Sequence, residues 1–216
     1  KQKSYKRPKF RYPVDILKTS ASKYLLNTLI YTVSARIQKN NKAAGIADGG
    51  ELIGITEDAF KKGMRQLAAA VNVITVAHNG AKEGLTATAA CSVSAEPPQV
   101  LVCVNTTSGA HDIIQETGAF CLNVLARDQE DIAMGFAGMD GADRSERFDL
   151  GSWCTLATGM PVLDGALANF DCQIAQQIQA GTHSVFIGLI VASRAVDDGA
   201  PLIYGDGQFT GVSNRD

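Results

Sequence analysis

Short apolar runs alternate with turn-forming residues along most of the chain, a pattern typical of β-strands. The turns His78-Asn79-Gly80 and Gly205-Asp206-Gly207 mark two hairpin positions. Many strands at short spacing predict a mainly β fold with short helices, closed or nearly closed into a barrel. The predicted strands are Val71–Ala77, Leu85–Ala90, Val100–Val104, Phe120–Leu125, Leu167–Gln179, Ser184–Val196, Pro201–Tyr204 and Gln208–Val212.

Three short helices are predicted between these strands. The first begins near Thr56, where a hydroxyl is followed by two acidic residues, and its apolar spacing extends to about Ala70. The second is expected at Asp112–Glu116, with Gly118 ending it, and the third at Asp128–Phe136. The polar stretch Gly138–Arg147, which follows the third helix, is expected to form a loop.

The stretch Gly84–Val104 is the most unusual part of the pattern. Between its two apolar runs lie small and hydroxylated residues, closed by Pro97-Pro98, which cannot donate to a sheet ladder. We interpret these residues as a polar turn. Small side chains let a flat ligand approach the backbone, and hydroxyls beside exposed amides can hold a phosphate. The stretch is therefore either a plain connection between strands or a binding site.

The N-terminal quarter differs in charge from the rest. Residues 1–50 carry eleven Lys/Arg and two acids, although the whole chain has a net charge of −2. We predict a basic N-terminal extension over residues 1–54, with an amphipathic helix from about Ala21 to Gln38 and a linker, and then a main domain over residues 55–216. Lys1–Pro13 is either a solvated tail or a surface for nucleic acid, and we favour the tail.

Composition narrows the classes of function. Hydrophobic residues make up 45% and charged residues 19%, as in globular proteins. No apolar run reaches the roughly 20 residues of a membrane-spanning helix, so no membrane partner is expected. The five cysteines show no C-x-x-C spacing, which predicts a reducing, cytoplasmic setting, and Cys91, Cys103 and Cys121 lie in apolar runs where cysteine is expected to be a small buried hydrophobe. The sequence has no metal-ligand spacing, nucleotide-binding glycine motif or sign of a Ser-His-Asp set.

A series of short motifs follows in a fixed order after Phe60. They are Phe60-x-x-x-Met64, Ala70-Val-Asn-Val-Ile-Thr75, Gly84-Leu-Thr-Ala-Thr-Ala89, Cys91-Ser-Val-Ser94, Pro97-Pro98, Leu101-Val-Cys-Val-Asn105, Cys121-Leu-Asn-Val-Leu125, Gln129, Phe136-Ala-Gly138, Glu146-Arg-Phe148, Trp153, Pro161-Val-Leu-x-Gly165, Gly181-Thr-His183 and Pro201-Leu-Ile-Tyr204. In these motifs the chain resembles the flavin reductase family, whose fold is the FMN-binding split β-barrel. It is most similar to the reductases that serve 4-hydroxyphenylacetate 3-monooxygenases, followed by those of pyrimidine degradation. The first 55 residues match nothing in that family.

The resemblance implies an NAD(P)H:flavin oxidoreductase. Such an enzyme oxidises NADH, or NADPH, reduces FMN or FAD, and releases the reduced flavin to a separate monooxygenase that acts on an aromatic substrate. The flavin accepts the hydride itself, so the protein is expected to supply stacking, orientation and exclusion of water. The family binds flavin at a subunit interface, which implies a homodimer. A non-enzymatic FMN-binding module on the same fold is the alternative.

The resemblance also implies which residues bind the flavin. Thr86–Ala89 are expected to contact the ring edge, Ser92–Ser94 the ribityl chain and phosphate, and Asn105 with the residues after it the phosphate end. Two residues of the first strand are weaker candidates. The candidate flavin-binding residues are Asn72, Val73, Thr86, Ala87, Thr88, Ala89, Ser92, Val93, Ser94, Asn105, Thr107 and Ser108.

Two further residues are expected to act on the nicotinamide substrate. His183 is the candidate catalytic residue, since its Gly-x-His context resembles the family position that meets the nicotinamide; a lone His in a turn is otherwise only a polar turn residue. Most members carry Asp where Thr182 stands. Arg147 either pairs with a dinucleotide phosphate or forms a surface ion pair with Asp143 or Glu146.

Overall fold

The computed structural model describes residues 55–138 and 144–212. The chain divides into two compact units, Lys1–Glu57 and Asp58–Asp216, and the second unit contains nearly everything described below. The predicted amphipathic helix at Ala21–Gln38 and the basic segment Lys1–Pro13 lie outside the described residues.

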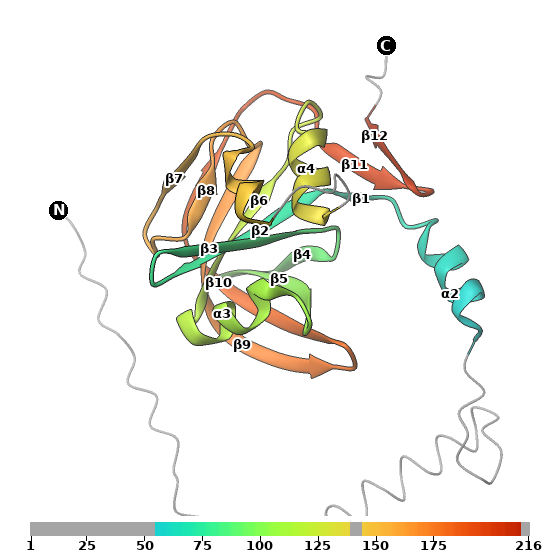
Figure 1. Cartoon of the computed structure of the whole chain (residues 1–216), viewed down its shortest axis with the longest axis horizontal. Coiled ribbons are helices and arrows are strands. Elements are labelled where there is room, and N and C mark those ends of the chain that lie inside the picture. The colour runs from blue at the N-terminus through green and yellow to red at the C-terminus, as the bar shows by residue number, and fades with distance from the viewer. Residues whose placement is uncertain (1–54, 139–143, 213–216) are drawn as a thin grey trace, which may run out of the picture. The chain divides into compact units, whose positions relative to one another are not determined.

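A seven-stranded antiparallel sheet forms the body of this unit, in the order β3-β2-β6-β9-β10-β5-β4 (Figure 1). Hairpins connect β2 with β3, β4 with β5 and β9 with β10, whereas the pairs β2-β6, β6-β9 and β10-β5 join strands distant in sequence, and the result is a sheet of the predicted mainly β class. The bounds are β2 (Asn72–His78), β3 (Ala81–Ala87), β4 (Ala90–Ala95), β5 (Pro98–Asn105), β6 (Ala119–Val124), β9 (Ala168–Ala180) and β10 (His183–Ala195).

Two smaller sheets complete the strand structure. One has the order β1-β11-β12, from β1 (Ala69–Ala70), β11 (Leu202–Gly205) and β12 (Gln208–Gly211). The other pairs β7 (Trp153–Thr155) with β8 (Pro161–Leu163). The β11–β12 hairpin turns at Asp206 and Gly207, which have φ angles of 50° and 81° and therefore suit a left-handed two-residue turn.

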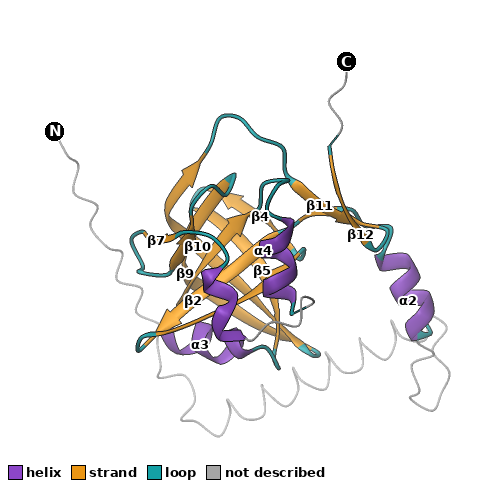
Figure 2. Cartoon of the chain, turned by 45° about the horizontal axis from the view of Figure 1, so that its top comes forward, coloured by secondary structure: helices purple, strands orange, loops and turns teal. Residues whose placement is uncertain are grey.

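The helices lie on the outside of the strand layer (Figure 2). They are α2 (Glu57–Met64), α3 (Gly109–Thr117) and α4 (Glu130–Ala137), with a 3-10 turn η1 at Arg144–Asp149. The side chain of Ser108 caps α3, and Gly118 at φ 66° ends it, because a left-handed residue closes the last turn without steric cost. In Figure 1, β3 runs between α3 and α4.

Two clusters of buried apolar side chains form the core. The larger lies between the sheet and α3 and includes Val102, Ile114, Phe120 and Phe186, all fully buried. The smaller joins β2 and β11 to α4 around Phe136. Burying large aliphatic and aromatic side chains contributes about 1.5–3 kcal/mol each, so these clusters fix α3 and α4 against the sheet.

The sheet does not close. Among the described residues, β3 and β4 are its two edge strands, although only Thr88 and Ala89 separate them in sequence. A tight turn joins them, in which the Ala90 N–H donates to the Thr88 carbonyl at 3.0 Å. We call the opening between these two edges the seam. It is the feature that gives a split barrel its name, and it leaves part of the β3 edge without a strand partner.

The structure confirms most predicted elements and corrects three details. The first helix ends at Met64 and not near Ala70, because Ala69 and Ala70 pair with β11. The predicted polar turn after Ala90 is the edge strand β4. Cys91, expected to be a buried hydrophobe, is exposed on that edge strand.

Candidate functional site

A polar pocket of about 310 Å³ opens along the seam. One wall is the edge of β3, and the opposite wall is formed where β5 ends and α3 begins. The end of α4 and η1 close the third side. Its lining residues are Glu83, Gly84, Leu85, Thr86, Asn105, Thr107, Ser108, Gly109, Phe136, Ala137 and Arg147.

The start of α3 supplies hydrogen-bond donors to the polar pocket. The Asn105 side-chain oxygen accepts from both the N–H and the hydroxyl of Thr107, each at 2.9 Å, which fixes the turn before the helix. The Ser108 hydroxyl accepts from the Ala110 N–H at 3.3 Å. The N-terminus of a helix attracts anions because its first N–H groups and its dipole carry partial positive charge.

Arg147 brings a full positive charge to the same pocket. Its Nε is buried and has no hydrogen-bond partner among the described residues. The neighbouring Phe148 packs against Phe136 and Trp153, with ring centroids 5.1 and 5.0 Å away, and this places the guanidinium beside the end of α4. An added Cβ at Gly138 would come within 3.0 Å of its Nη2, so the absence of a side chain there leaves room for the guanidinium.

A smaller apolar pocket of about 170 Å³ adjoins the polar one, sharing Thr86 and Ala137 with it. Its lining residues are Val71, Thr86, Ala87, Thr88, Ala137, Tyr204 and Phe209. The rings of Tyr204 and Phe209 meet edge to face with centroids 5.3 Å apart and form one wall. The Thr86 hydroxyl donates to the Ala133 carbonyl at 2.7 Å, so Thr86 is tied to α4.

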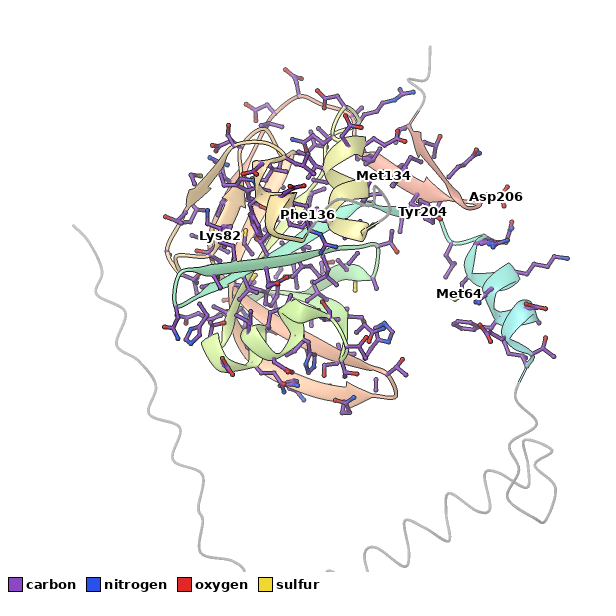
Figure 3. All side chains as sticks on the ribbon, viewed as in Figure 1. Met64, Lys82, Met134, Phe136, Tyr204 and Asp206 are labelled. Atoms are coloured by element: carbon purple, nitrogen blue, oxygen red, sulfur yellow. The ribbon has the colours of Figure 1, made fainter. Side chains whose placement is uncertain are left out.

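A third pocket of about 420 Å³ continues from the small apolar pocket along α2, sharing Thr88 and Tyr204 with it. Figure 3 labels Phe136, Tyr204 and Met64, which line the polar, the small apolar and the third pocket respectively. The third pocket also includes Ala89. The three pockets adjoin one another through these shared residues, and we call them together the groove, which changes from polar to apolar along the end of β3.

The structure brings eight of the predicted residues to this groove. Arg147 and the three residues around the start of α3 line its polar end; the resemblance implied contact with the flavin phosphate for those three residues and with a dinucleotide phosphate for Arg147. Thr86 lies at the junction of the polar and apolar parts, and the residues after it line the apolar part. The eight are Thr86, Ala87, Thr88, Ala89, Asn105, Thr107, Ser108 and Arg147.

The other flavin candidates lie elsewhere. Asn72 and Val73 are buried in β2, and the Asn72 amide donates to the carbonyls of Ala70 and Ala87, so both residues are part of the framework. Ser92, Val93 and Ser94 lie on β4, where the pairing with β5 shifts register. None of these five residues lines the three pockets described above.

His183 is the first residue of β10 and pairs directly with Asn105 of β5. It is half-buried, and its Nδ1 lies 3.0 Å from the Thr182 hydroxyl. The pairing places it one strand away from a residue of the polar pocket. It does not line that pocket itself.

Sequence reasoning did not assign several wall residues. Glu83, Gly84, Gly109 and Phe136 line the polar pocket, and Tyr204 with Phe209 forms the apolar wall. Phe136 and Tyr204 belong to the motifs on which the resemblance rests, so the motif pattern was the signal that could have found them. Phe209 carries no such signal, because only the β11–β12 hairpin brings it to the groove.

A hydrogen-bonded Asp-His-Ser set was also missed. His111 of α3 connects Asp112 to Ser184 of β10, with its Nδ1 2.8 Å from an Asp112 carboxylate oxygen and its Nε2 2.9 Å from the Ser184 hydroxyl. The sequence separates the histidine and the serine by 73 positions, and no local pattern indicates that they meet.

The described residues also bear on metal sites and membrane-spanning helices. Residues 55–138 and 144–212 contain no group of three or more His, Cys, Asp or Glu side chains that could hold a metal ion. Within those ranges, no helix has the length and apolar character required to cross a membrane.

Comparison with known proteins identifies the family. The flavin reductase like domain matches residues 64–213. A Stutzerimonas stutzeri protein named FMN reductase (NADH) RutF is 40% identical over 160 residues, covering 74% of this chain and 90% of that protein. The 4-hydroxyphenylacetate 3-monooxygenase reductase component of Salmonella typhimurium is 43% identical over 145 residues, covering 67% of this chain and 85% of that protein.

A solved structure agrees with these sequence matches. BorF, the flavin reductase component of a bacterial two-component tryptophan halogenase, superposes with a TM-score of 0.68 at 34% identity, covering 74% of this chain and 100% of that chain. The domain match spans the whole sheet, α3, α4 and the groove at the seam. The chain belongs to the flavin reductase family.

Proposed function

We propose that the protein is an NADH-dependent flavin oxidoreductase that reduces FMN or FAD and supplies the reduced flavin to a partner monooxygenase. The named relatives support each part of this proposal. One is named as an NADH-dependent FMN reductase, and another as the reductase component of an aromatic hydroxylase. The observation that carries the proposal for this chain is the groove at the seam, which has Arg147 and the first turn of α3 at its polar end and apolar side chains at the other.

The groove fits a flavin nucleotide. The buried Nε of Arg147 has no partner among the residues described and lies at the same end as the first turn of α3, so this end suits a phosphate. The apolar end, lined by Ala87, Tyr204 and Phe209, suits a flat ring system. The β3 edge joins the two ends, and its length from Gly84 to Thr88 is about 13 Å at 3.3 Å per residue.

Each part of the groove has a separate task in this function. Arg147 and the start of α3 hold the phosphate and thereby orient the nucleotide. Tyr204 and Phe209 exclude water from the ring. When bound, the flavin accepts a hydride from the reduced nicotinamide. The protein's contribution is proximity and orientation. His183 beside Asn105 is proposed to hydrogen-bond the nicotinamide nucleotide.

Three finer features belong to the same proposal. The partner is proposed to be a flavin-dependent monooxygenase that hydroxylates an aromatic compound such as 4-hydroxyphenylacetate, reached by diffusion of the reduced flavin. The protein is proposed to be a homodimer and to act in the cytoplasm. The exposed apolar residues Ile178 and Val191 of the long β9–β10 hairpin support the dimer, because such side chains favour burial between copies.

The direct test is steady-state NADH oxidation by the purified protein with FMN, FAD, riboflavin or no flavin. We expect turnover that saturates with flavin, and hydroxylation when a 4-hydroxyphenylacetate oxygenase component is added behind a dialysis membrane. Tight FMN binding without NADH oxidation would instead identify a non-enzymatic flavin-binding module and overturn the proposal. Turnover without hydroxylation would retain the reductase and reject this partner.

A further inference from the structure

His111 and Ser184 form the buried centre of a hydrogen-bond network outside the groove. His111 is 6% exposed, and Ser184 is fully buried. The Ser184 hydroxyl lies 2.9 Å from His111 Nε2, 3.1 Å from the Gln179 side-chain oxygen and 3.3 Å from the Gln177 side-chain nitrogen. The network therefore joins the first turn of α3 to both strands of the β9–β10 hairpin.

The chemistry of the partner groups determines which atoms of this network donate and which accept. The Asp112 carboxylate only accepts, so His111 Nδ1 carries a proton and donates to it. The Gln177 amide donates to the Ser184 oxygen, and the single hydroxyl proton of Ser184 is shared between His111 Nε2 and Gln179. Removing the imidazole would take away the one hydrogen bond by which α3 reaches Ser184, and Gln177 and Gln179 of β9 would be its remaining partners.

The order Asp112–His111–Ser184 resembles a nucleophile activated by a histidine. Its position does not suit that role. Ser184 has no exposed surface, and neither it nor His111 lines any of the three pockets. The His111 ring also packs on Phe186 of the core, with ring centroids 5.7 Å apart. The set therefore acts as a connection between elements.

What it connects are two parts of the nucleotide site. His111 follows Ser108 and Gly109 of the polar pocket by one turn of α3. Ser184 follows His183 directly, and His183 pairs with Asn105. We propose that His111 is a positioning residue: through its hydrogen bond to Ser184, it holds the start of α3 against β10 and so keeps the phosphate-binding donors in place. This rests on the proposed function.

The test compares two amide replacements that differ in reach. The His111→Gln side chain can place its amide near the position of Nε2 and keep the bond to Ser184. The shorter His111→Asn can occupy the position of Nδ1 but does not reach Ser184. We expect His111→Asn to raise KM for FMN about tenfold, which corresponds to about 1.4 kcal/mol. KM for riboflavin, which lacks the phosphate, should stay unchanged, and His111→Gln should restore the native FMN value.

The ratio of the two KM values separates positioning from loss of folded protein, because a smaller folded fraction lowers the rate with both flavins alike. An unchanged ratio in His111→Asn would overturn the positioning role while leaving the reductase function of the native protein untouched. If the native protein oxidises no NADH, the proposed function fails. Dissociation constants for FMN and riboflavin, from fluorescence quenching, then decide in the same way: a raised FMN-to-riboflavin ratio in His111→Asn supports the role, and an unchanged ratio rejects it.

Discussion

Arg147 shows how a single side chain can be positioned for a ligand that the protein alone does not satisfy. Its Nε is buried without a partner in the described part of the chain, although buried guanidinium groups normally pair. The packing of Phe148 and the space left by Gly138 place it beside the end of α4, in the pocket that the start of α3 also lines. A phosphate at this position would complete its hydrogen bonds.

We therefore expect Arg147→Ala to weaken FMN binding about 10- to 100-fold, since hydrogen bonds to charged groups contribute about 1.5–3 kcal/mol. Riboflavin binding should change little. Arg127→Ala is the matched control, because Arg127 is an exposed arginine that lines none of the three pockets. Titration of flavin fluorescence measures both. Equal losses for FMN and riboflavin would show that Arg147 does not bind the phosphate.

His183 is predicted to act on the nicotinamide nucleotide and not on the flavin. His183→Ala should raise KM for NADH about tenfold, as expected for a lost hydrogen bond with its partner left unpaired, and leave KM for FMN unchanged. His78→Ala, in the distant β2–β3 turn, provides the same change of side chain without an expected effect. Steady-state kinetics with each substrate varied will decide. Unaltered constants would remove His183 from the site.

Cys172 links stability to pH. Burial, with a smaller contribution from the Asp171 charge, raises the pKa of its thiol from 9.0 to about 12. The unfolded thiol loses its proton at a lower pH than the folded one, so unfolding releases a proton between pH 9 and 12, and the free energy of unfolding falls as pH rises through this range. Cys121 is shifted in the same direction.

Replacing this thiol should reduce the pH dependence. We expect Cys172→Ala to lower the slope of the free energy of unfolding by about one proton, which is about 1.4 kcal/mol per pH unit, when urea unfolding is followed from pH 9 upward. The absolute stability will also fall because a cavity is created, but the slope reports ionisation alone. The same slope in both proteins would contradict the raised pKa.

At the level of residues, the sequence candidates at strand ends and in turns line the groove, whereas those inside β2 and β4 do not. Asn105, Thr107 and Ser108 end a strand and begin a helix, and local chain geometry alone places them together. Asn72 and Ser92 share the polar character of site residues but serve β2 and β4. Polarity alone does not show which face of a strand a residue occupies, so these two predictions found no support in the pockets.

At the level of elements, the packing of α4 against β3 determines the width of the polar pocket. Gly84 allows the close approach: an added Cβ would lie 2.6 Å from a Phe136 ring carbon and 2.9 Å from the Ile74 carbonyl oxygen. Such contacts are shorter than real side chains tolerate, and the carbonyl cannot move without disturbing the β2–β3 pairing.

Gly84→Ala should therefore lower the free energy of unfolding by about 1–3 kcal/mol, the usual cost of forcing extra volume into a packed region. It should also raise KM for flavin, because β3 and α4 would separate at the groove. Gly63→Ala is the control, since nothing lies within 4 Å of its Cβ position in α2. Urea unfolding of the three proteins gives the comparison. Equal stability of both variants would contradict the packing argument.

The elements themselves were largely readable from the sequence. Apolar, β-branched runs predicted β2 and β6, which are buried along most of their length, and the longer runs predicted β9 and β10, whose first halves alternate in burial. β4 was missed for a physical reason. An edge strand with mostly exposed residues has no apolar alternation to reveal it, and only its pairing with β5 makes it a strand. The end of α2 was likewise set by the pairing of β1 with β11.

At the scale of the molecule, the β9–β10 hairpin extends beyond the core. Residues 175–180 of β9 are all exposed, and Ile178 retains 45% of its accessible surface. A long hairpin with an exposed apolar side chain is suited to contact a second copy, as we propose for the homodimer.

Light scattering coupled to size-exclusion chromatography should therefore show twice the mass of one chain. Ile178→Glu should shift the population toward monomer, because a charge would replace apolar surface within the proposed contact. Gln176→Glu, a charge added at an exposed polar position of the same strand, should have a smaller effect. A native protein that is monomeric and fully active would refute the dimer.

The seam has a consequence for how a ligand enters and leaves the protein. Unpaired strand edges tend to pair with further strands. Here a register shift interrupts β4, Pro97-Pro98 follows it, and Lys82 and Glu83 place charges along β3. Because the two edge strands are not hydrogen-bonded to each other, a ligand can bind and leave at the seam without any backbone hydrogen bond of the sheet being broken. For an enzyme proposed to release reduced flavin to another enzyme, such an open site is an advantage that a closed barrel would lack.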